Sequence, residues 1–290
     1  PAYRAAHFGK WHISADPSRY GYDAHDGQTA NKEGGFKNER KAQWDGYSED
    51  DPKRVHSITH RAIDFMRDAV AKEQPFFLQL SHYAVHSNIV YSESSYSALN
   101  GKAKGKFHKD QGYAAMVHDM DLSIGDLLKA YEALGLAENT YIIFTSDNGG
   151  MPVLPMQMNL GRPYKAGLNL PLLRGKWDLT EGGIRVPFAM MGPGIKPGSQ
   201  SDTPIVTYDL LPTLADLAGS TKNLPDALDG GSFKPLLTDP EQKVKRAFDG
   251  LIFHFPHYNR VGMNEPHSAL RDGDYKFIQF PASQRSLLFN

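Results

Sequence analysis

Four short segments of the sequence combine charged or hydrogen-bonding side chains with positions where a strand is expected to end or begin. The most distinctive is Ser146-Asp147-Asn148-Gly149-Gly150, which directly follows the apolar run 140–145. In open α/β sheets, ligands bind beyond the carboxyl ends of the strands. The Asp147 carboxylate and the Asn148 amide oxygen are hard ligands, suited to Ca²⁺ or Mg²⁺ rather than zinc. The alternative interpretation is an Asx-turn that leaves a strand, since Asp-Asn-Gly is a common turn sequence.

The second segment is Gly9-Lys10-Trp11-His12, in which glycine permits a close backbone approach. Lys10 offers a point charge to a tetrahedral anion, and His12 can accept or donate a proton near neutral pH. Taken alone, the same four residues also fit a surface loop with a stacked tryptophan.

The third segment, His82–His86, follows the apolar run 76–80, and its two histidines have the spacing of a strand-end metal site. A hydrogen-bonded structural pair is the alternative. The fourth segment runs from Arg174 to Pro187 and alternates glycine with charged residues, among them Lys176. This composition, directly before a strand pattern, suits a loop that holds an anion, whereas a solvated linker is the simpler interpretation.

The elements that position these segments alternate between strand and helix patterns. Apolar spacing predicts helices at 56–72, 112–134 and 210–218, and apolar runs predict strands at 76–80, 140–145 and 186–191. Residues 1–52 show weak periodicity and are expected to be a strand-end loop followed by irregular chain. After Gly230, the strand patterns at 251–255 and 275–280, with the turn sequence Arg271–Asp274, indicate an antiparallel sheet.

The predicted fold class is therefore α/β, with a mostly parallel sheet covered by helices on both faces. We expect one α/β domain over residues 1–235 and the beginning of a small antiparallel C-terminal subdomain over residues 236–290. A chain of 290 residues can bury a large core without covalent staples.

Composition excludes several classes of function. The formal net charge of -1 gives no indication of nucleic acid or an anionic membrane as the main partner. With no cysteine, the chain has no disulfide, thiolate metal site or thiol nucleophile. No apolar run reaches the length of about 18 residues that a membrane span needs.

The order of the four segments resembles that of the arylsulfatase-type family within the alkaline phosphatase superfamily. Residues 204–219, 229–233 and 269–276 follow in the order expected of that family, so the resemblance covers nearly the whole chain. It implies a sulfuric ester hydrolase that acts on a sulfated small molecule or glycan, with calcium as the metal and magnesium as the alternative ion. It also implies a periplasmic, secreted or lysosome-like location.

The resemblance assigns a role to six residues. Lys10 resembles the lysine that contacts the sulfate, and His12 the histidine that helps to deprotonate the nucleophile. His86 resembles the histidine that protonates the leaving alcohol, and Lys176 the second sulfate-binding lysine. Asp147 and Asn148 resemble calcium ligands, whereas His82 has no counterpart and is expected to be structural.

The nucleophile of that family is a formylglycine made from the first residue of Cys/Ser-x-Pro-x-Arg. Residues Ala15–Arg19 imitate this motif, but alanine has no group to convert, and the segment follows Lys10 instead of preceding it. Both ends of the sequence are typical of the interior of a longer protein. We therefore expect the formylglycine upstream of Pro1, in an N-terminal segment of the same protein on which activity depends.

Two other functions stay open at this point. A phosphate or phosphonate ester hydrolase of the same superfamily would share the scaffold, and a non-catalytic protein that binds sulfated glycans could use the same lysines. His254, with His257, His267 and aromatic neighbours, is a candidate for binding the sugar. A histidine- and phenylalanine-rich core strand is the alternative.

Overall fold

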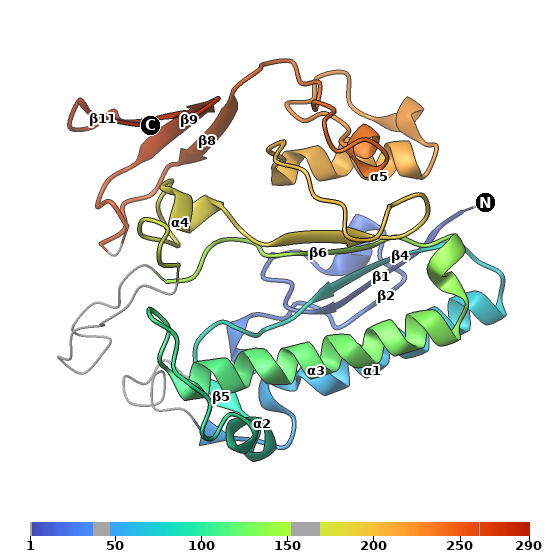
Figure 1. Ribbon diagram of the computed structural model, residues 1–290. Helices are drawn as coiled ribbons and strands as arrows, with labels where there is room; N and C mark the ends of the chain where they lie inside the picture. The colour runs from blue at the N-terminus through green and yellow to red at the C-terminus, as the bar shows by residue number, and fades with distance from the viewer. Residues whose placement is uncertain (1, 37–46, 152–168, 261) are drawn as a thin grey trace. The chain divides into compact units, whose positions relative to one another are not determined.

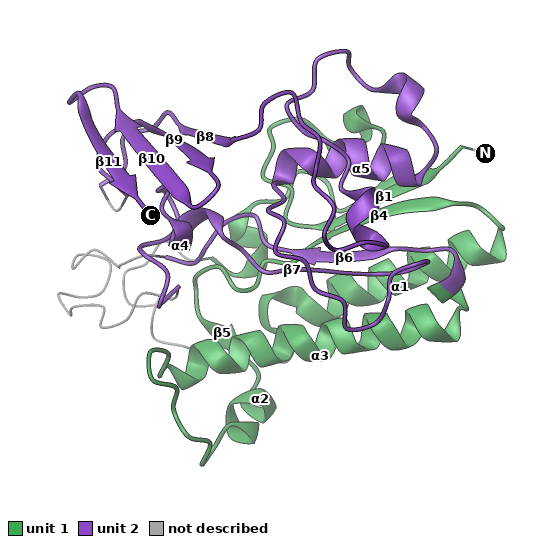
Figure 2. Cartoon of the chain, turned by 45° about the horizontal axis from the view of Figure 1, so that its top comes forward, with its two compact units in different colours: residues 1–137, 154–166 green, residues 138–153, 167–290 purple. Residues whose placement is uncertain are grey.

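In a computed structural model of the chain, residues 2–36, 47–151, 169–260 and 262–290 are described. They form two compact units, which Figure 2 colours separately. Unit 1 holds residues 2–36 and 47–137, and unit 2 holds the described residues from 138 to 290. Each unit is described by itself below.

Unit 1 is built on a parallel three-stranded sheet. Strand β1 (Arg4–Gly9) lies in the middle, between β2 (Ala24–His25) and β4 (Phe76–Ser81), and Ala6 is opposite Ala24 on one side and Leu78 on the other. The expectation of a strand-end loop and irregular chain over residues 1–52 is wrong for β1. Its residues include no β-branched side chain, so their strand propensity is weak, and pairing with a neighbour on each side makes the strand.

Two long helices cover one face of this sheet, α1 (Val55–Ala71) and α3 (Gln111–Ala133), which lie side by side in Figures 1 and 2. Both lie within two residues of the helices predicted from apolar spacing. The core between α1 and the sheet consists of Ala6, Phe8, Ala62 and Phe65, with Leu127 of α3 packed against it. Asp51 accepts hydrogen bonds from two backbone N–H groups of the first turn of α1, which fixes where that helix begins.

Four smaller elements of unit 1 lie around the start of α1 and the segment after His86. Strand β3 (Tyr47–Ser48) pairs in parallel with β5 (Val90–Tyr91), and the short helix α2 (Glu93–Ala98) follows β5. The 3-10 segment η3 (Pro52–Arg54) connects the β3 region to α1.

Unit 2 begins with an antiparallel pair of strands. Strand β6 (Ile142–Thr145) pairs with β7 (Phe188–Met191), and Ile142 is opposite Met191. Helix α5 (Leu210–Leu217) follows, as its apolar spacing predicted. The preceding residue, Asp209, is buried and forms an ion pair with Arg246 at 2.5 Å. The same carboxylate accepts hydrogen bonds from the backbone N–H groups of Val206 and Gly231.

A four-stranded antiparallel sheet ends the chain. Its strands are β8 (Leu251–Phe255), β9 (His267–Asp272), β10 (Tyr275–Phe280) and β11 (Arg285–Phe289), in the order β11-β10-β9-β8. The predicted turn joins β9 to β10 through Gly273, whose φ of +54° is in the left-handed region. The described chain is thus a mixed α/β protein with a parallel sheet and a small antiparallel C-terminal sheet, as predicted.

Within the described residues, no helix combines the length and the apolar character that crossing a bilayer requires.

Candidate active site

The first candidate segment lies where β1 ends. Lys10 donates its backbone N–H to the carbonyl of Ser81 at the end of β4, at 2.8 Å. Gly9 has a φ of +96°, and a Cβ at this position would lie 2.0 Å from the Ser81 oxygen. Only glycine allows this approach, so the Gly9 position fixes the point from which Lys10 leaves the sheet.

Thr29 holds the next two residues. The backbone N–H of Trp11 donates to its hydroxyl at 2.9 Å, and the backbone N–H of His12 donates to its carbonyl at 2.7 Å. The Trp11 indole donates to the carbonyl of Ala15 at 2.7 Å, which folds the tryptophan back onto its own loop. The His12 side chain is exposed, and its φ of +59° turns the backbone sharply at this residue.

His86 lies in the segment that follows β4. Its backbone N–H donates to the carbonyl of Tyr83 at 3.0 Å, and its half-buried ring packs edge-on against Phe36. The ring nitrogen Nδ1 lies 3.0 Å from the carbonyl of Ser87. A carbonyl can only accept, so Nδ1 carries the proton and Nε2 is the nitrogen through which this ring would exchange one.

His82, in the same segment, has a different environment. Both of its ring nitrogens are buried and have no hydrogen-bond partner in the described part of the chain. Burial, with a smaller contribution from His56, lowers the pKa of His82 to about 4. The ring is therefore neutral across the physiological range.

The segment that imitates the formylglycine motif has a structural role of its own. Pro17–Tyr20 form the 3-10 helix η1, and the Asp16 carboxylate caps it by accepting from the backbone N–H of Ser18 at 3.0 Å. The Ser18 hydroxyl donates to the same carboxylate oxygen at 2.6 Å. The expected ordinary loop is therefore a short capped turn.

In unit 2, Asp147 and Asn148 lie directly beyond the end of β6, as predicted. The Asp147 carboxylate is exposed and accepts no hydrogen bond from any described residue. The Asn148 side-chain nitrogen donates to the carbonyl of Gly149 at 2.9 Å, which leaves its oxygen as the atom that can bind a cation.

These two oxygens fit calcium by their chemistry, because Ca²⁺ prefers carboxylate and amide oxygens. They supply two of the six to eight ligands that the ion takes. Across residues 2–36, 47–151, 169–260 and 262–290, no group of three or more His, Asp or Glu side chains is arranged to hold a metal.

Lys176 is tied to the same turn. Its backbone N–H donates to the carbonyl of Gly150 at 2.8 Å. Asn169 reinforces this contact, because its amide exchanges two hydrogen bonds of 2.8 Å with the backbone of Gly150 and donates to the carbonyl of Arg174 at 2.9 Å. The structure therefore ties the backbone of the predicted anion-binding lysine to the turn that carries the predicted pair of cation ligands, and the Lys176 ammonium lies over the Trp177 ring, 5.6 Å from its centroid.

The glycines of this region are required by close packing. Gly149 donates its N–H to the carbonyl of Gly183 at 2.9 Å. A Cβ on Gly149 would lie 1.7 Å from the carbonyl oxygen of Gly182, and a Cβ on Gly182 would lie 2.2 Å from that of Arg174. Backbone atoms cannot move aside as a flexible side chain can, so no larger residue fits at Gly149 or Gly182.

Buried polar contacts hold the loop that carries Lys176. Arg174 donates to the fully buried carboxylate of Asp178 at 2.7 Å, and the Thr180 backbone N–H donates to the same carboxylate at 3.1 Å. From the C-terminal sheet, Lys276 donates to the carbonyl of Leu179 at 3.1 Å and forms an ion pair with Glu181. Burial lowers the pKa of Lys276, and Glu181 opposes that shift.

His254 lies on the other face of the C-terminal sheet. Its exposed side chain interacts with the Ser268 hydroxyl at 2.8 Å, whereas its neighbours Phe253 and Phe255 pack toward Leu179. The structure therefore does not bring His254 to the loop of Lys176. The histidine of this sheet that reaches the loop is His267, whose Nε2 accepts from the backbone N–H of Leu179 at 3.3 Å.

One residue that the sequence pattern did not identify is Lys53. It is only 2% exposed, although lysine is among the residues least often buried. Burial lowers the pKa of Lys53 to about 7; attraction by Glu49 opposes this shift and repulsion by Lys10 adds to it. Its sequence context, Asp51-Pro52-Lys53-Arg54, is typical of a polar loop and gave no indication of this environment.

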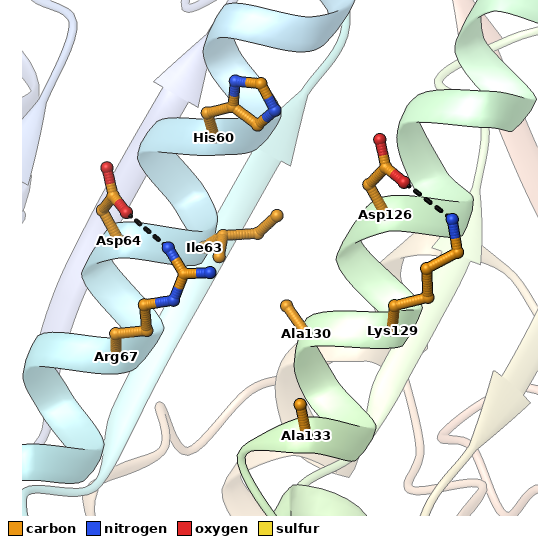
Figure 3. A pocket seen from close by; sticks show the side chains of 8 residues that line it. All are labelled: His60, Ile63, Asp64, Arg67, Asp126, Lys129, Ala130 and Ala133. Carbon is orange, nitrogen blue, oxygen red and sulfur yellow. Dashed lines mark hydrogen bonds and ion pairs between the residues drawn. The ribbon is translucent and has the colours of Figure 1, made fainter.

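A hollow on unit 1 lies between α1 and α3, with a volume of about 540 Å³ (Figure 3). Its charged side chains pair within their own helices, Arg67 with Asp64 and Lys129 with Asp126, both at 3.0 Å. None of the predicted site residues lines it.

Two families match the sequence. The family described as Sulfatase matches residues 2–220, and the family described as N-sulphoglucosamine sulphohydrolase, C-terminal, matches residues 175–288. The two matches overlap in the loop that carries Lys176 and in α5.

Similar proteins carry the corresponding names. A protein of Formosa agariphila named Sulfatase is 34% identical over 235 residues, which cover 76% of this chain and 40% of that protein. Arylsulfatase A of Homo sapiens is 36% identical over 199 residues, which cover 68% of this chain and 34% of that protein. The chain thus spans 40% or less of the length of these two relatives.

Solved structures share the fold. The crystal structure of Ps i-CgsB in complex with k-i-k-neocarrahexaose superposes with a TM-score of 0.73 at 23% identity, over 99% of this chain and 64% of that one. A protein in complex with its substrate D-glucosamine-2-N,6-O-disulfate gives a TM-score of 0.71 at 20% identity, over 99% and 73% of the two chains.

The packing at Gly149 makes a testable prediction. Gly149→Ala forces the Gly182 backbone to move, so we expect a loss of about 3 kcal/mol or more in the free energy of unfolding, measured by urea denaturation. Gly125→Ala is the matched control, because a Cβ there, within α3, meets no atom within 4 Å. It should stabilise the protein by about 0.5–1 kcal/mol. Equal stabilities of the two variants would contradict the proposed packing.

The environment of His82 predicts a dependence of stability on pH. Its folded pKa of about 4 lies below the unfolded value of 6.5, so the unfolded chain binds the proton first. Stability should therefore fall by about 3 kcal/mol as the pH decreases from 6.5 to 4, and this contribution should be absent in His82→Leu. Unfolding measured across this pH range checks the prediction, with the exposed His60→Leu as control. The same acid-dependent loss in His82→Leu would show that other groups cause it.

Proposed function

Because the chain belongs to the sulfatase family, we propose that the protein hydrolyses sulfate esters and that its substrates are sulfated carbohydrates. The observation that supports the proposal is the backbone hydrogen bond from Lys176 to Gly150, which ties the loop of Lys176 to the turn that carries Asp147 and Asn148. An anion-binding cation next to two hard oxygen ligands is an arrangement that a metal-dependent sulfatase requires.

In unit 1, we assign the sulfate to Lys10 and proton transfer to His12 and His86. Charge builds on the bridging oxygen as the S–O bond of a sulfate ester breaks, so an acid at that oxygen stabilises the transition state more than the ground state. The Nδ1–H of His86 is directed to the Ser87 carbonyl, so Nε2 would deliver a proton to the leaving alcohol from the imidazolium form, in which both ring nitrogens carry one. The exposed His12 can exchange protons with solvent and thus serve as the base.

In unit 2, we assign to Lys176 a role in binding a sulfate oxygen, and Asp147 and Asn148 would hold Ca²⁺, with Mg²⁺ as the alternative ion. When bound, calcium would neutralise negative charge on the sulfate, and the formylglycine of the family would supply the nucleophilic hydroxyl. The rigid loop between Arg174 and Ile184 keeps Lys176 in place, because Asp178, Glu181 and the backbone glycines fix it from several sides.

Two findings support a carbohydrate as the substrate. One of the two matching families is described as N-sulphoglucosamine sulphohydrolase, C-terminal. One protein of the same fold has a structure in complex with its substrate, D-glucosamine-2-N,6-O-disulfate. The exposed face of the C-terminal sheet, with His254, is a further candidate for contacting the sugar. A periplasmic, secreted or lysosome-like location is part of the same proposal.

The activity is tested in the protein at its natural length with an aryl sulfate. Lys10→Met and Lys176→Met should each lower kcat/KM by about 10²–10³-fold, because each removes a fixed charge from the developing anion. The exposed lysines Lys32 and Lys196, replaced in the same way, are matched controls from the two units and should leave kcat/KM unchanged. Turnover of an aryl phosphate but not of an aryl sulfate would contradict the proposal.

The metal is tested by a measurement that needs no turnover. Calcium should raise the Tm, since an ion that binds only the folded state stabilises it by mass action. A chelator should reverse this shift, and Asp147→Ala should abolish it. Asp202→Ala removes an exposed carboxylate of the same unit and should retain the full shift. A calcium shift that survives in Asp147→Ala would place the ion elsewhere.

A further inference from the structure

Lys53 occupies an unusual position at the start of α1. It lies in η3, with a φ of +56°, and the next residue, Arg54, has a φ of +55°. The left-handed region is unfavourable for residues other than glycine, because Cβ comes too close to the following carbonyl oxygen. The chain therefore turns twice against its conformational preference at the point where the lysine side chain is buried.

The ammonium group of Lys53 lacks a neutralising contact. Neither a hydrogen bond nor an ion pair to it is present in the described part of the chain. Its charged neighbours act at longer range: Glu49 favours the charged form, and Lys10 disfavours it. A buried ammonium without a partner is costly, and other buried charges in the chain are paired, as with Arg246 and Asp209.

The surroundings of Lys53 connect it to the predicted site of unit 1. The segment η3 packs against α1 and against β5, the strand that follows the segment of His86. Repulsion between Lys53 and Lys10 shows that the two cations lie within electrostatic range of each other. Two lysines without an ion pair among the described residues create a positive potential that an anion would relieve.

We propose that Lys53 is a second anion-binding lysine of unit 1, which acts with Lys10 on an oxyanion of the substrate. The inference rests on the proposed function and extends it to a residue outside the motifs of the family resemblance. The oxyanion is either the sulfate that is cleaved or a second sulfate or carboxylate on the same sugar. A bound anion would favour the charged form of Lys53, so its binding takes up a proton when the pH is above about 7.

The first experiment compares Lys53→Met and Lys53→Arg in the protein at its natural length. For at least one of two test substrates, an aryl sulfate and a disulfated glucosamine, Lys53→Met should lower kcat/KM by about 10- to 100-fold. The loss should appear mainly in KM, because one charge-assisted contact with the substrate is lost. Lys53→Arg should restore part of the loss, and the exposed Lys32→Met should have no effect. The Tm of Lys53→Met should be unchanged or higher, since an unpaired buried charge is removed.

Two substrates distinguish the two sources of the anion. An aryl sulfate carries a single anionic group, and D-glucosamine-2-N,6-O-disulfate carries two. A loss with both substrates supports contact with the cleaved sulfate, and a loss with the disulfated sugar alone supports contact with the second group. If Lys53→Met retains wild-type kcat/KM for both, the inference is wrong, whereas the absence of turnover in the wild type would defeat the proposed function itself.

A measurement on the wild type keeps the inference testable should the variants fold poorly. Inhibition by inorganic sulfate should weaken as the pH rises from 6 to 9, because Lys53 loses its charge in this range. The dependence should be flatter in Lys53→Arg, since arginine stays charged in this range. A sulfate inhibition constant that does not change with pH in the wild type would overturn the proposal.

Discussion

Backbone-to-backbone contact at positions without a side chain is the constraint on which the candidate residues of each unit depend. In unit 1, Gly9 brings the end of β1 against the carbonyl of Ser81, and in unit 2, Gly149 and Gly182 bring two turns into contact. Each contact lies at the residue next to a functional side chain or within two residues of one. The placement of the neighbouring lysines and oxygen ligands therefore depends on these three glycines, which have no functional side chain.

Charge is handled in two ways in this chain. Asp178 and Asp209 are fully buried, and each meets an arginine together with backbone N–H groups, so the cost of their burial is offset locally. Lys53 is buried without such an ion pair among the described residues, and the charges that act on its pKa are those of Glu49, which raises it, and Lys10, which lowers it. The ion pairs of Asp178 and Asp209 hold their loops in place, whereas the burial of Lys53 lowers the stability of the folded chain.

The sequence was sufficient for the elements whose pattern is local. The apolar spacing of α1 and α3, the run of β4 and the turn at Gly273 were each recognisable, because one helix face or one turn conformation determines them. Strand β1 could not be recognised, because neighbouring strands and not its own residues make it a strand. The strand-end positions of Lys10, Asp147 and Asn148 were predicted from the order of motifs, but Lys53 depends on long-range packing that no local pattern encodes.

The two faces of the C-terminal sheet have different surroundings, since one packs against the loop of Lys176 and the other is exposed. Lys276, His267 and Phe280 face the loop of Lys176 and supply its hydrogen bonds and apolar contacts. Ile252, His254 and Tyr275 face outward and are exposed. Because side chains alternate between the two faces along each strand, residues of the outer face can be substituted without changing the residues of the inner face. Related proteins can thus differ in the residues that this exposed face presents to a ligand and still keep the same contacts with the loop of Lys176.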